Sequence, residues 1–207
     1  MHFAQHSAYE QLAVDQLRWL PELQLGYYPV SQAPYDQDYF DRYAEMAGTE
    51  RGEQITAARV ELVRRHWGGQ VVDIGIGCGQ FIGAHGNALG DDINPVGKRW
   101  LAERSLQWHG GTVDALTFWD VLEHIHDPGP LLARAATWVF ISLPIFEGHA
   151  HVQRSRHYRK DEHCWYFTRA GLVRFMGLHG FDLIEESDIE TRLGREDIGS
   201  FAFRRVC

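Results

Sequence analysis

The sequence predicts a single α/β domain with a mostly parallel sheet, and two observations carry this prediction. Short apolar runs at 71–76, 88–93, 114–119 and 138–143 alternate with helical patterns, which is typical of parallel strands whose crossover helices cover both faces of a sheet. Two strand-like runs then follow without a predicted helix between them, so we expect an antiparallel strand at the end. A chain of 207 residues suits one core of this kind.

Local signals predict the elements in order. Over 53–67 the apolar residues fall at helical spacing, and a Gly-Gly pair at 68–69 ends the pattern before the first strand. The stretches PVGKRWLAERS and PGPLLARAATW supply helices between the later strands. Thr168 is expected to cap a further helix that Gly180 stops. The closing strands are FDLIEES and GSFAFRR.

Residues 1–52 differ in composition from the rest of the chain. They show little periodicity and many aromatic residues interleaved with proline, a mixture that suits a wrapping segment or a lid better than a core element. We therefore predict an aromatic N-terminal segment at 1–52 and a folded domain at 53–207. Simple packing of the segment on the sheet is the equal alternative to a lid. The aromatic residues concerned are Tyr27, Tyr28, Tyr35, Tyr39, Phe40 and Tyr43.

Charge and composition disfavour several classes of partner. A formal net charge of -8 and a pI near 5.8 argue against a surface built to track phosphates, so nucleic acid is an unfavoured partner. The three cysteines lack the spacing of a zinc knuckle or a disulfide framework, which favours a reducing compartment. No secretory leader is recognisable, and no apolar run approaches the roughly 20 residues that span a bilayer. We expect a cytoplasmic protein without a membrane partner.

A glycine-rich loop follows the first predicted strand, in the run QVVDIGIGCGQF. Its pattern is D-x-G-x-G-x-G from Asp73 to Gly79, whereas a dinucleotide fingerprint requires G-x-G-x-x-G. Asp73 would repel a pyrophosphate, and a carboxylate in a buried strand is costly unless it accepts hydrogen bonds or meets a cationic ligand. The loop therefore favours a ligand with a cationic group, although a turn serving only strand-to-helix packing is the alternative.

Four stretches together resemble one family. VVDIGIGCGQF resembles motif I of class I S-adenosylmethionine-dependent methyltransferases, and GDDINP resembles their second motif. VDALTFWDVLEHIHDP is similar to the fourth-strand region of the small-molecule branch, and HYRKDEHCWYFTRAGLVRFMGLHGFDLIEE is similar to the same branch farther on. The resemblance spans residues 53–205. It implies a Rossmann-like, doubly wound, seven-stranded sheet, mostly parallel with an antiparallel C-terminal strand and shortened around the third strand, and S-adenosyl-L-methionine as the cofactor.

The resemblance also implies cofactor-binding roles. Gly75 and Gly77 would let the backbone pass beside the methionine moiety, and Asp73 would interact with its amino group. Asp92 would accept the two ribose hydroxyls, with Asp91 as the competing candidate. The residues after the fourth strand would line the methionine end. The full predicted set is Asp73, Ile74, Gly75, Gly77, Gly79, Asp92, Ile93, Asn94, Trp119, Asp120, Val121 and Leu122.

The acceptor side is predicted from topology. Ligands of open α/β sheets bind outside the carboxyl ends of the strands, so the long connection at 144–168 should open beside the glycine loop. Glu123 and His124 would face the acceptor, and His124, Glu123 or His163 would act as a base where the nucleophile must lose a proton. A structural role for His124 is at least equally favoured. The predicted substrate contacts are His157, Tyr158 and Trp165.

Two departures from the family pattern affect these roles. The third strand and its helix are compressed into 104–114, which removes the usual acidic residue near adenine and leaves Trp108 and His109 as its candidate contacts. The connection 144–168 is rich in histidine and also contains Cys164, which raises the alternative of a metal site. Because the spacing is not that of a helical or knuckle site, we expect no metal. The histidines are His149, His151, His157 and His163.

The predicted function is methyl transfer to an oxygen or nitrogen of a small-molecule or sugar-like acceptor. Neither a [DNS]-P-P-[YFW] run after the fourth strand nor a Pro-Cys nucleophile is present, which argues against base methylation. Two alternatives stay open. One is a non-catalytic cofactor-binding scaffold or regulatory protein, and the other is a nucleic-acid-modifying methyltransferase that docks through RSRHYRK. The sequence leaves the oligomeric state open.

Overall fold

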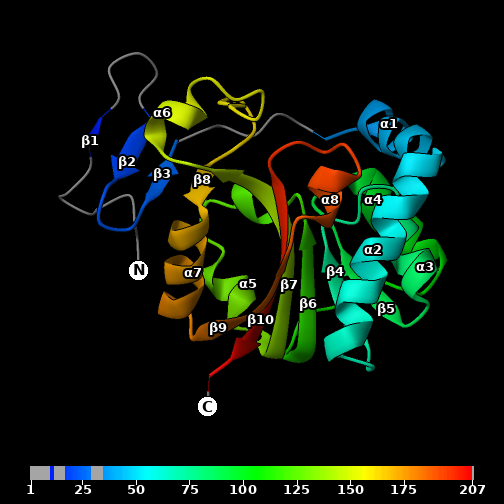
Figure 1. The fold of residues 1–207 in the computed structure, drawn as a ribbon. Coiled ribbons are helices and arrows are strands. Elements are labelled where there is room, and N and C mark those ends of the chain that lie inside the picture. Colours follow the sequence, from blue (N-terminus) through cyan, green and yellow to red (C-terminus); the bar gives the residue numbers. More distant parts are fainter. Residues whose placement is uncertain (1–9, 12–16, 29–34, 207) are drawn as a thin grey trace.

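A computed structural model describes residues 10–11, 17–28 and 35–206 (Figure 1). The central sheet has the order β5-β4-β6-β7-β10-β9. The first four of these strands are parallel, and β10 lies antiparallel between β7 and β9. The strands are β4 (Val71–Ile74), β5 (Ala88–Asp91), β6 (Val113–Trp119), β7 (Ala135–Phe146), β9 (Phe181–Ser187) and β10 (Ile198–Arg205). The predicted mostly parallel sheet with an antiparallel C-terminal strand is therefore confirmed.

The third strand of the expected seven is reduced to a single bridge. Gly90 of β5 pairs with Gln107 in parallel, and the Gly90 N–H donates to the Leu106 carbonyl at 2.9 Å. The Trp108 N–H in turn donates to the Gly90 carbonyl at 2.8 Å. The predicted shortening around this strand is confirmed, because the segment forms a single bridge with β5 in place of a full strand.

Helices cover both faces of the sheet, so the domain has three layers. Figure 1 shows α5 and α7 on one face and α2, α3 and α4 on the other. Thr168 caps α7 by accepting from the Gly171 N–H at 3.0 Å, as predicted. The helices of these two layers are α2 (Glu50–His66), α3 (Gln80–His85), α4 (Pro95–Glu103), α5 (Gly129–Leu132) and α7 (Arg169–Leu178).

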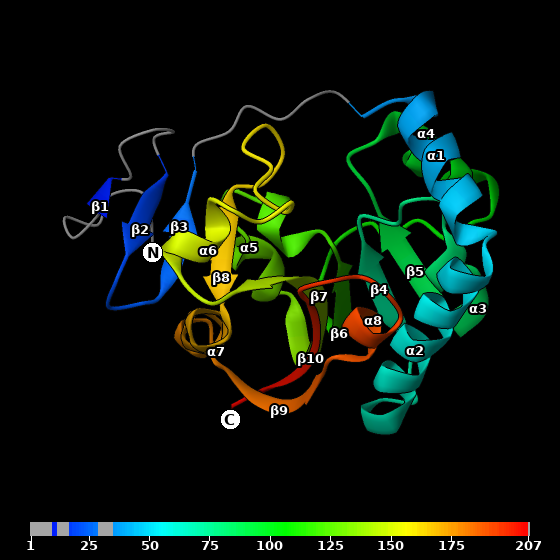
Figure 2. The same ribbon diagram turned by 45° about the horizontal axis from the view of Figure 1, so that its top comes forward.

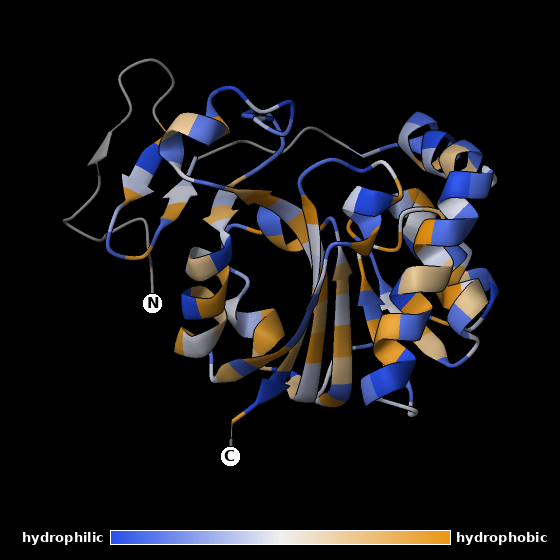
Figure 3. Cartoon of the chain, viewed as in Figure 1, coloured by the Kyte–Doolittle hydropathy of each residue, from blue (hydrophilic) through white to orange (hydrophobic). Residues whose placement is uncertain are grey.

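Alternating side chains of each central strand enter two separate cores. Val72 and Ile141 pack toward α5 and α7, whereas Val71 and Phe140 pack toward α2 and α3. This division follows from the two-residue period of a strand, which sends neighbouring side chains to opposite faces. Figure 3 shows hydrophobic colours along the central strands, whereas α1 and α2 carry hydrophilic and hydrophobic residues in turn. Among the described helices, none is long and apolar enough to cross a membrane.

A second group of strands extends the sheet from the end of β7. β8 (Trp165–Thr168) pairs in parallel with the last residues of β7, and β3 (Leu25–Tyr27) and β2 (Arg18–Leu20) continue antiparallel from β8. β1 (Glu10–Gln11) pairs with β2. Two sequence expectations are thereby corrected, because part of the N-terminal segment is sheet and the connection 144–168 contains a strand. Burial of the apolar faces of both segments explains this pairing across the chain.

Short helices complete the described elements. α1 (Gln37–Ala47) precedes α2, and Figure 2 shows it beside α4. A 3-10 turn, η2 (Leu122–His124), follows β6, and α6 (His149–Val152) follows β7. α8 (Ile189–Arg192) separates β9 from β10, where the sequence predicted a loop without a helix.

Candidate active site

The glycine loop joins β4 to α3 in a conformation that needs glycine. Gly75, Gly77 and Gly79 have φ values of 73°, 57° and 82°, in the left-handed region that other residues rarely adopt. A Cβ on Gly75 would lie 2.5 Å from the Val121 side chain, and one on Gly79 would collide with the ring of Trp100. The loop therefore presents bare backbone at the carboxyl end of β4, beside the residues that follow β6.

Asp73 lies within β4 and is almost completely buried, with 1% of its surface exposed. Its Oδ1 accepts a hydrogen bond of 2.6 Å from the Thr117 hydroxyl of β6. Burial raises the pKa of Asp73 to about 8, and the Thr117 bond and the charge of Arg59 only partly oppose this rise. A ligand whose ammonium group lay beside Asp73 would lower the pKa of this carboxyl group and favour its ionised form.

Asp92 follows β5 and is also buried. Its Oδ1 accepts from the Asn94 N–H at 2.7 Å, while its own N–H donates to Asp91 Oδ1 at 2.9 Å. Burial raises the pKa of Asp92. Asn94 caps α4, and the neighbouring Ile93 is 61% exposed, an unusual exposure for a large apolar side chain. This turn offers a carboxylate and an apolar surface side by side, which suits a ribose and the base attached to it.

The residues after β6 divide between core and edge. Trp119 packs against Phe81, with ring centroids 5.2 Å apart, in the core between the sheet and α2 and α3, which we call the α2-side core. Leu122 is buried in the core between the sheet and α5 and α7, which we call the α7-side core. Both side chains therefore belong to the cores and leave little surface at the edge of the sheet for a ligand. Asp120 has a φ of 58°, which asparagine and aspartate tolerate better than most residues. Val121 contacts the glycine loop directly, as the Gly75 geometry requires.

A buried ion network surrounds Asp120, which we call the arginine network: Arg59, Asp120, Glu190 and Arg195. Arg59 donates to Glu190 at 2.7 Å and to Asp120 at 2.8 Å, and Arg195 donates to both carboxylates. Although burial favours protonation of Asp120, the charges of Arg195 and Arg59 hold its pKa below the usual range. The sequence analysis missed Arg59, Glu190 and Arg195, because they lie far apart in the chain and carry no motif.

The three residues predicted as candidate bases come together in one cluster. Glu123 and His124 belong to η2, and His163 lies just before β8. One ligand atom from each lies within 4.8 Å of the others, and the two imidazole rings are 4.6 Å apart at 87°. The Cys164 N–H fastens the two segments by donating to the Glu123 carbonyl at 2.7 Å. We call Glu123, His124 and His163 the acceptor-edge cluster.

Burial dominates the protonation of this cluster. It raises the pKa of Glu123 well above the ordinary value, with the charge of Asp120 acting in the same direction. Burial and the neighbouring His124 lower the pKa of His163 to about 2, and burial lowers the pKa of His124 as well. Both imidazoles are therefore neutral near pH 7 and carry lone pairs.

The three predicted substrate contacts occupy different environments. Trp165 is 3% exposed and lies in the α7-side core, where its indole N–H donates to the Ile125 carbonyl at 2.8 Å. Such a position supports the wall of the site and leaves little surface for an acceptor. Tyr158 packs edge-on against Tyr166. His157 lies with its Nε2 2.9 Å from the Glu196 carbonyl.

The four histidines of the alternative metal site do not form one cluster within the described residues. His151 lies 3.6 Å from Asp197, and His149 packs against Trp19. Of the four, only His163 enters a cluster of metal-ligating side chains within the described ranges. Near the shortened third strand, Trp108 packs partly buried against the α7-side core and His109 is exposed, and their role toward adenine stays a prediction.

Helix α1 lies across the cofactor side of this edge. The Asn94 side chain donates to the Asp36 carbonyl at 3.0 Å, and the Gln80 side chain donates to the Ala47 carbonyl at 2.7 Å. The Tyr43 ring lies 3.2 Å from the position that a Cβ on Gly77 would take. Residues 35–47 thus cover the glycine loop, and the remaining lid prediction at 1–9, 12–16 and 29–34 lies outside the described residues.

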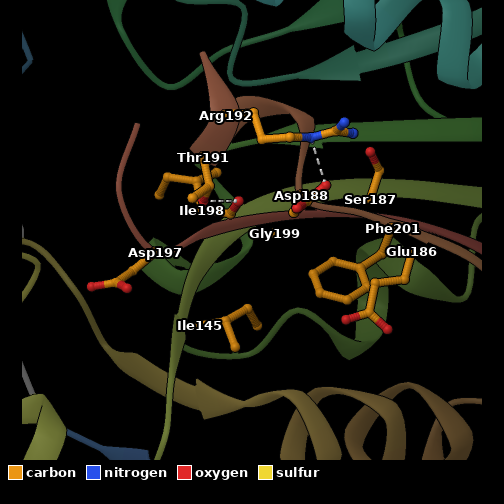
Figure 4. A pocket seen from close by; sticks show the side chains of 10 residues that line it. All are labelled: Ile145, Glu186, Ser187, Asp188, Thr191, Arg192, Asp197, Ile198, Gly199 and Phe201. Carbon is orange, nitrogen blue, oxygen red and sulfur yellow. Dashed lines mark hydrogen bonds and ion pairs between the residues drawn. The ribbon is translucent and has the colours of Figure 1, made fainter. Parts of the chain in front are cut away.

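A groove of about 520 Å³ is lined by residues in and next to β9, α8 and β10, and by Ile145 of β7 (Figure 4). It contains three carboxylates, Glu186, Asp188 and Asp197, and an ion pair of 2.9 Å between Arg192 and Asp188. None of the predicted site residues lines it. We therefore assign the candidate active site to the glycine loop and the acceptor-edge cluster. The other lining residues are Ile145, Ser187, Thr191, Ile198, Gly199 and Phe201.

Comparison with known proteins identifies the class. The sequence profile of the methyltransferase-domain family matches residues 35–186, so the chain belongs to this family. The predictions of a class I methyltransferase and of S-adenosyl-L-methionine as its cofactor are confirmed. The match begins at residue 35, within the predicted lid or wrapping segment at 1–52. No protein of curated function matches the chain by sequence.

Solved structures share the fold at low sequence identity. Magnesium protoporphyrin IX methyltransferase from Synechocystis with bound SAH is 19% identical, with a TM-score of 0.60 over 82% of this chain and 95% of that chain. The 1,6-didemethyltoxoflavin-N1-methyltransferase of Burkholderia thailandensis is 14% identical, with a TM-score of 0.55 over 97% and 100% of the two chains. A glycopeptide N-methyltransferase complexed with S-adenosyl-L-methionine is 13% identical, with a TM-score of 0.53 over 84% and 100%.

Proposed function

We propose that this methyltransferase transfers a methyl group to an oxygen or nitrogen of a small-molecule acceptor. The observation that carries the proposal is the convergence of Glu123, His124 and His163 within 4.8 Å of one another. This cluster begins two residues after Val121, which itself contacts the glycine loop. Polar groups for an acceptor therefore lie next to the loop that holds the methyl donor.

The residues divide the work of the reaction. When bound, the cofactor supplies an electrophilic methyl group, whose carbon bonds to the acceptor atom while the electron pair of the broken bond stays on sulfur. Asp73 is proposed to hold the ammonium group and Asp92 the ribose hydroxyls, and α1 excludes water from this side. His124, His163 or Glu123 would receive the proton that the acceptor releases.

A small acceptor is favoured over nucleic acid. The net charge of -8 opposes a phosphate-tracking surface. Within RSRHYRK, Arg156 and Arg159 already lie near Glu196 and Glu162, at 3.8 Å and 3.0 Å. The names of the structural neighbours refer to a porphyrin, a toxoflavin precursor and a glycopeptide as acceptors of those proteins. These observations support a small or sugar-like molecule as the acceptor.

Two measurements test the proposal in sequence. Titration calorimetry with S-adenosylmethionine and its demethylated product should give saturable binding of both. A screen of hydroxylated and amine-bearing compounds should then release the demethylated product in the presence of enzyme and acceptor together. Binding without turnover across a broad screen would favour the non-catalytic alternative. A nanomolar duplex-DNA complex at physiological salt would favour the nucleic-acid alternative.

A further inference from the structure

The acceptor-edge cluster combines two imidazoles and one carboxylate from separate segments. Glu123 and His124 come from η2 after β6, and His163 comes from the connection that leads into β8. Their ligand atoms lie within 4.8 Å of one another. Since the Cys164 N–H bonds to the Glu123 carbonyl, the backbone itself keeps these segments together.

Two of the three side chains are buried, and each has one polar atom without a hydrogen-bond partner among the described residues. Glu123 is 2% exposed and His163 is 4% exposed. Glu123 Oε2 and His163 Nδ1 have no hydrogen-bond partner among the residues that the structure describes. Burying such an atom unpaired costs about 1–3 kcal/mol, and more than about 90% of buried polar groups are paired. Two orphaned atoms in one cluster therefore point to a ligand.

The tautomer of His124 fits the same conclusion. Its Nδ1 lies 3.0 Å from the Glu162 carbonyl, an atom that can only accept a hydrogen bond. Nδ1 must therefore carry the proton, and in the neutral ring the lone pair is on Nε2. A histidine that binds a metal usually donates its other ring N–H to a carbonyl or carboxylate in this way.

We infer that Glu123, His124 and His163 bind one divalent transition-metal ion, with zinc as the reference metal. Two histidines and a carboxylate form a known three-ligand set for zinc that leaves a coordination position open. Imidazole ligands select against magnesium, which prefers oxygen. At zinc–ligand distances near 2.1 Å, tetrahedral ligand atoms lie roughly 3.4 Å apart, so atoms that are up to 4.8 Å apart must approach by up to about 1.4 Å. This inference replaces the sequence expectation of no metal.

The position of the ion gives it a chemical role. Glu123 and His124 closely follow Val121, which meets the glycine loop, so the ion would lie near that edge. A bound divalent ion there would hold an acceptor hydroxyl and lower its pKa, so that its proton passes to solvent rather than to the three side chains, whose lone pairs then bind the ion. The inference goes beyond the proposed methyl transfer, because metal binding can be measured without cofactor or acceptor.

The test uses untagged, chelator-treated full-length protein titrated with Zn²⁺ alone, and separately with Co²⁺ and Mg²⁺. We expect one equivalent of Zn²⁺, visible ligand-field bands with Co²⁺, and no binding of Mg²⁺. Glu123→Gln and His163→Asn should each weaken Zn²⁺ binding by more than the roughly 10- to 100-fold that loss of a supporting contact costs. His149→Asn is the matched control, because His149 lies on the same connection, is exposed and packs against Trp19 outside the cluster.

Specific outcomes would overturn the inference. Wild-type affinity in Glu123→Gln or His163→Asn would remove these residues from the ligand set, and loss of binding in His149→Asn would move the site to the other histidines. Circular dichroism and S-adenosylmethionine binding check that each variant folds. If a variant fails to fold, the Co²⁺ spectrum of the wild-type protein decides, because a spectrum like that of hexaaqua cobalt would contradict imidazole ligation. Failure here leaves methyl transfer itself unaffected.

Discussion

Asp120 and Glu123 lie three residues apart after the same strand, yet the fold treats the two carboxylates in opposite ways. Asp120 receives hydrogen bonds from both Arg59 and Arg195, whose charges hold its pKa low in spite of burial. Glu123 is more deeply buried, at 2% exposed against 20% for the Asp120 side chain; its Oε2 is unpaired, and its pKa is raised. The Asp120 carboxylate thus has its partners within the fold, whereas the unpaired oxygen of Glu123 is available to a ligand.

The chain positions explain the difference. The arginine network joins α2, the residue after β6, α8 and the turn between α8 and β10, so it ties the C-terminal segment to the carboxyl end of β6. The acceptor-edge cluster comes from η2 and from His163, two residues before β8. It contains no cation that could pair with Glu123, and its imidazoles are neutral. Four predictions test this difference between carboxylates that the fold pairs and carboxylates that it leaves for a ligand.

The largest effect is expected from breaking the arginine network. Replacing Arg59 by Met removes the cation that bridges Asp120 and Glu190, and Glu190 is 0% exposed. Because a buried charge then loses a partner, the free energy of unfolding should fall by about 3–5 kcal/mol. Urea denaturation at neutral pH measures the change. The control is Glu61→Ala, which removes an exposed pair with Arg65 and should change stability little. Equal effects in both variants would mean that the network adds nothing beyond a surface pair.

The next largest effect concerns cofactor affinity. Asp92 is a buried carboxylate that accepts a hydrogen bond from the Asn94 N–H. Asp92→Ala should weaken S-adenosylmethionine binding by about 1–3 kcal/mol through the loss of charge-assisted hydrogen bonds to ribose. Calorimetry on Asp92→Ala and Asp91→Ala separates the two candidates. A loss confined to Asp91→Ala would transfer the ribose role to that residue.

A pH effect is expected from Asp73. Its pKa is raised from 3.8 to about 8 by burial, so the folded protein binds a proton that the unfolded chain has lost. In the absence of ligand, this residue therefore lowers stability progressively as pH rises from about 4 toward 8. An ammonium group beside Asp73 favours ionisation, so cofactor affinity should rise roughly tenfold per pH unit below pH 8, with release of close to one proton.

Calorimetry in buffers of different ionisation enthalpy measures that proton directly. The matched variant is Asp73→Asn, in which the affinity should lose most of its dependence on pH. A wild-type protein that binds the cofactor without releasing a proton would show that the ammonium group lies elsewhere.

The smallest effect is expected at Glu123. Since Glu123 Oε2 has no partner among the described residues, exchanging the carboxyl group for an amide removes no hydrogen bond of that atom. Glu123→Gln should change the free energy of unfolding of the metal-free protein by less than about 1 kcal/mol. The same urea titration as for Arg59→Met provides the measurement. A loss as large as in Arg59→Met would make Glu123 a structural group and would erase the contrast with Asp120.

The sequence predicted the site residues that lie close together in the chain and missed those that long-range contacts bring together. The glycine loop and Asp92 could be predicted because a strand, a turn and an acidic residue lie within one short run, where local geometry leaves a pattern. The end of β6 was predicted in part, since Asp120 reaches the edge while Trp119 enters the core. Arg59, Glu190 and Arg195 could not be predicted, because their contacts join segments up to 131 residues apart.

The fold shows the same limit. Alternating apolar residues predicted β4 to β7, and the weak run near 104–114 predicted the reduced third strand. The run WYFT of β8 is buried at every position, which removes the alternation by which a strand is recognised. Trp165 was therefore interpreted as a loop residue that faces an acceptor. The partner of β8 lies near the other end of the sequence, where local patterns carry no information about it.

The pairing of β3 with β8 has a consequence for the synthesis of the protein. The Thr168 hydroxyl donates to the Gln24 carbonyl, and 144 residues separate the two. At about 5–20 residues per second, a ribosome needs roughly 7–29 s to bridge that interval. During this time the apolar side chains of β2 and β3, among them Trp19, Leu20 and Leu25, have been made but have no sheet to join. The β2–β3 hairpin is thus made well before the strand that pairs with it, so its apolar side chains stay uncovered while the rest of the sheet is synthesised.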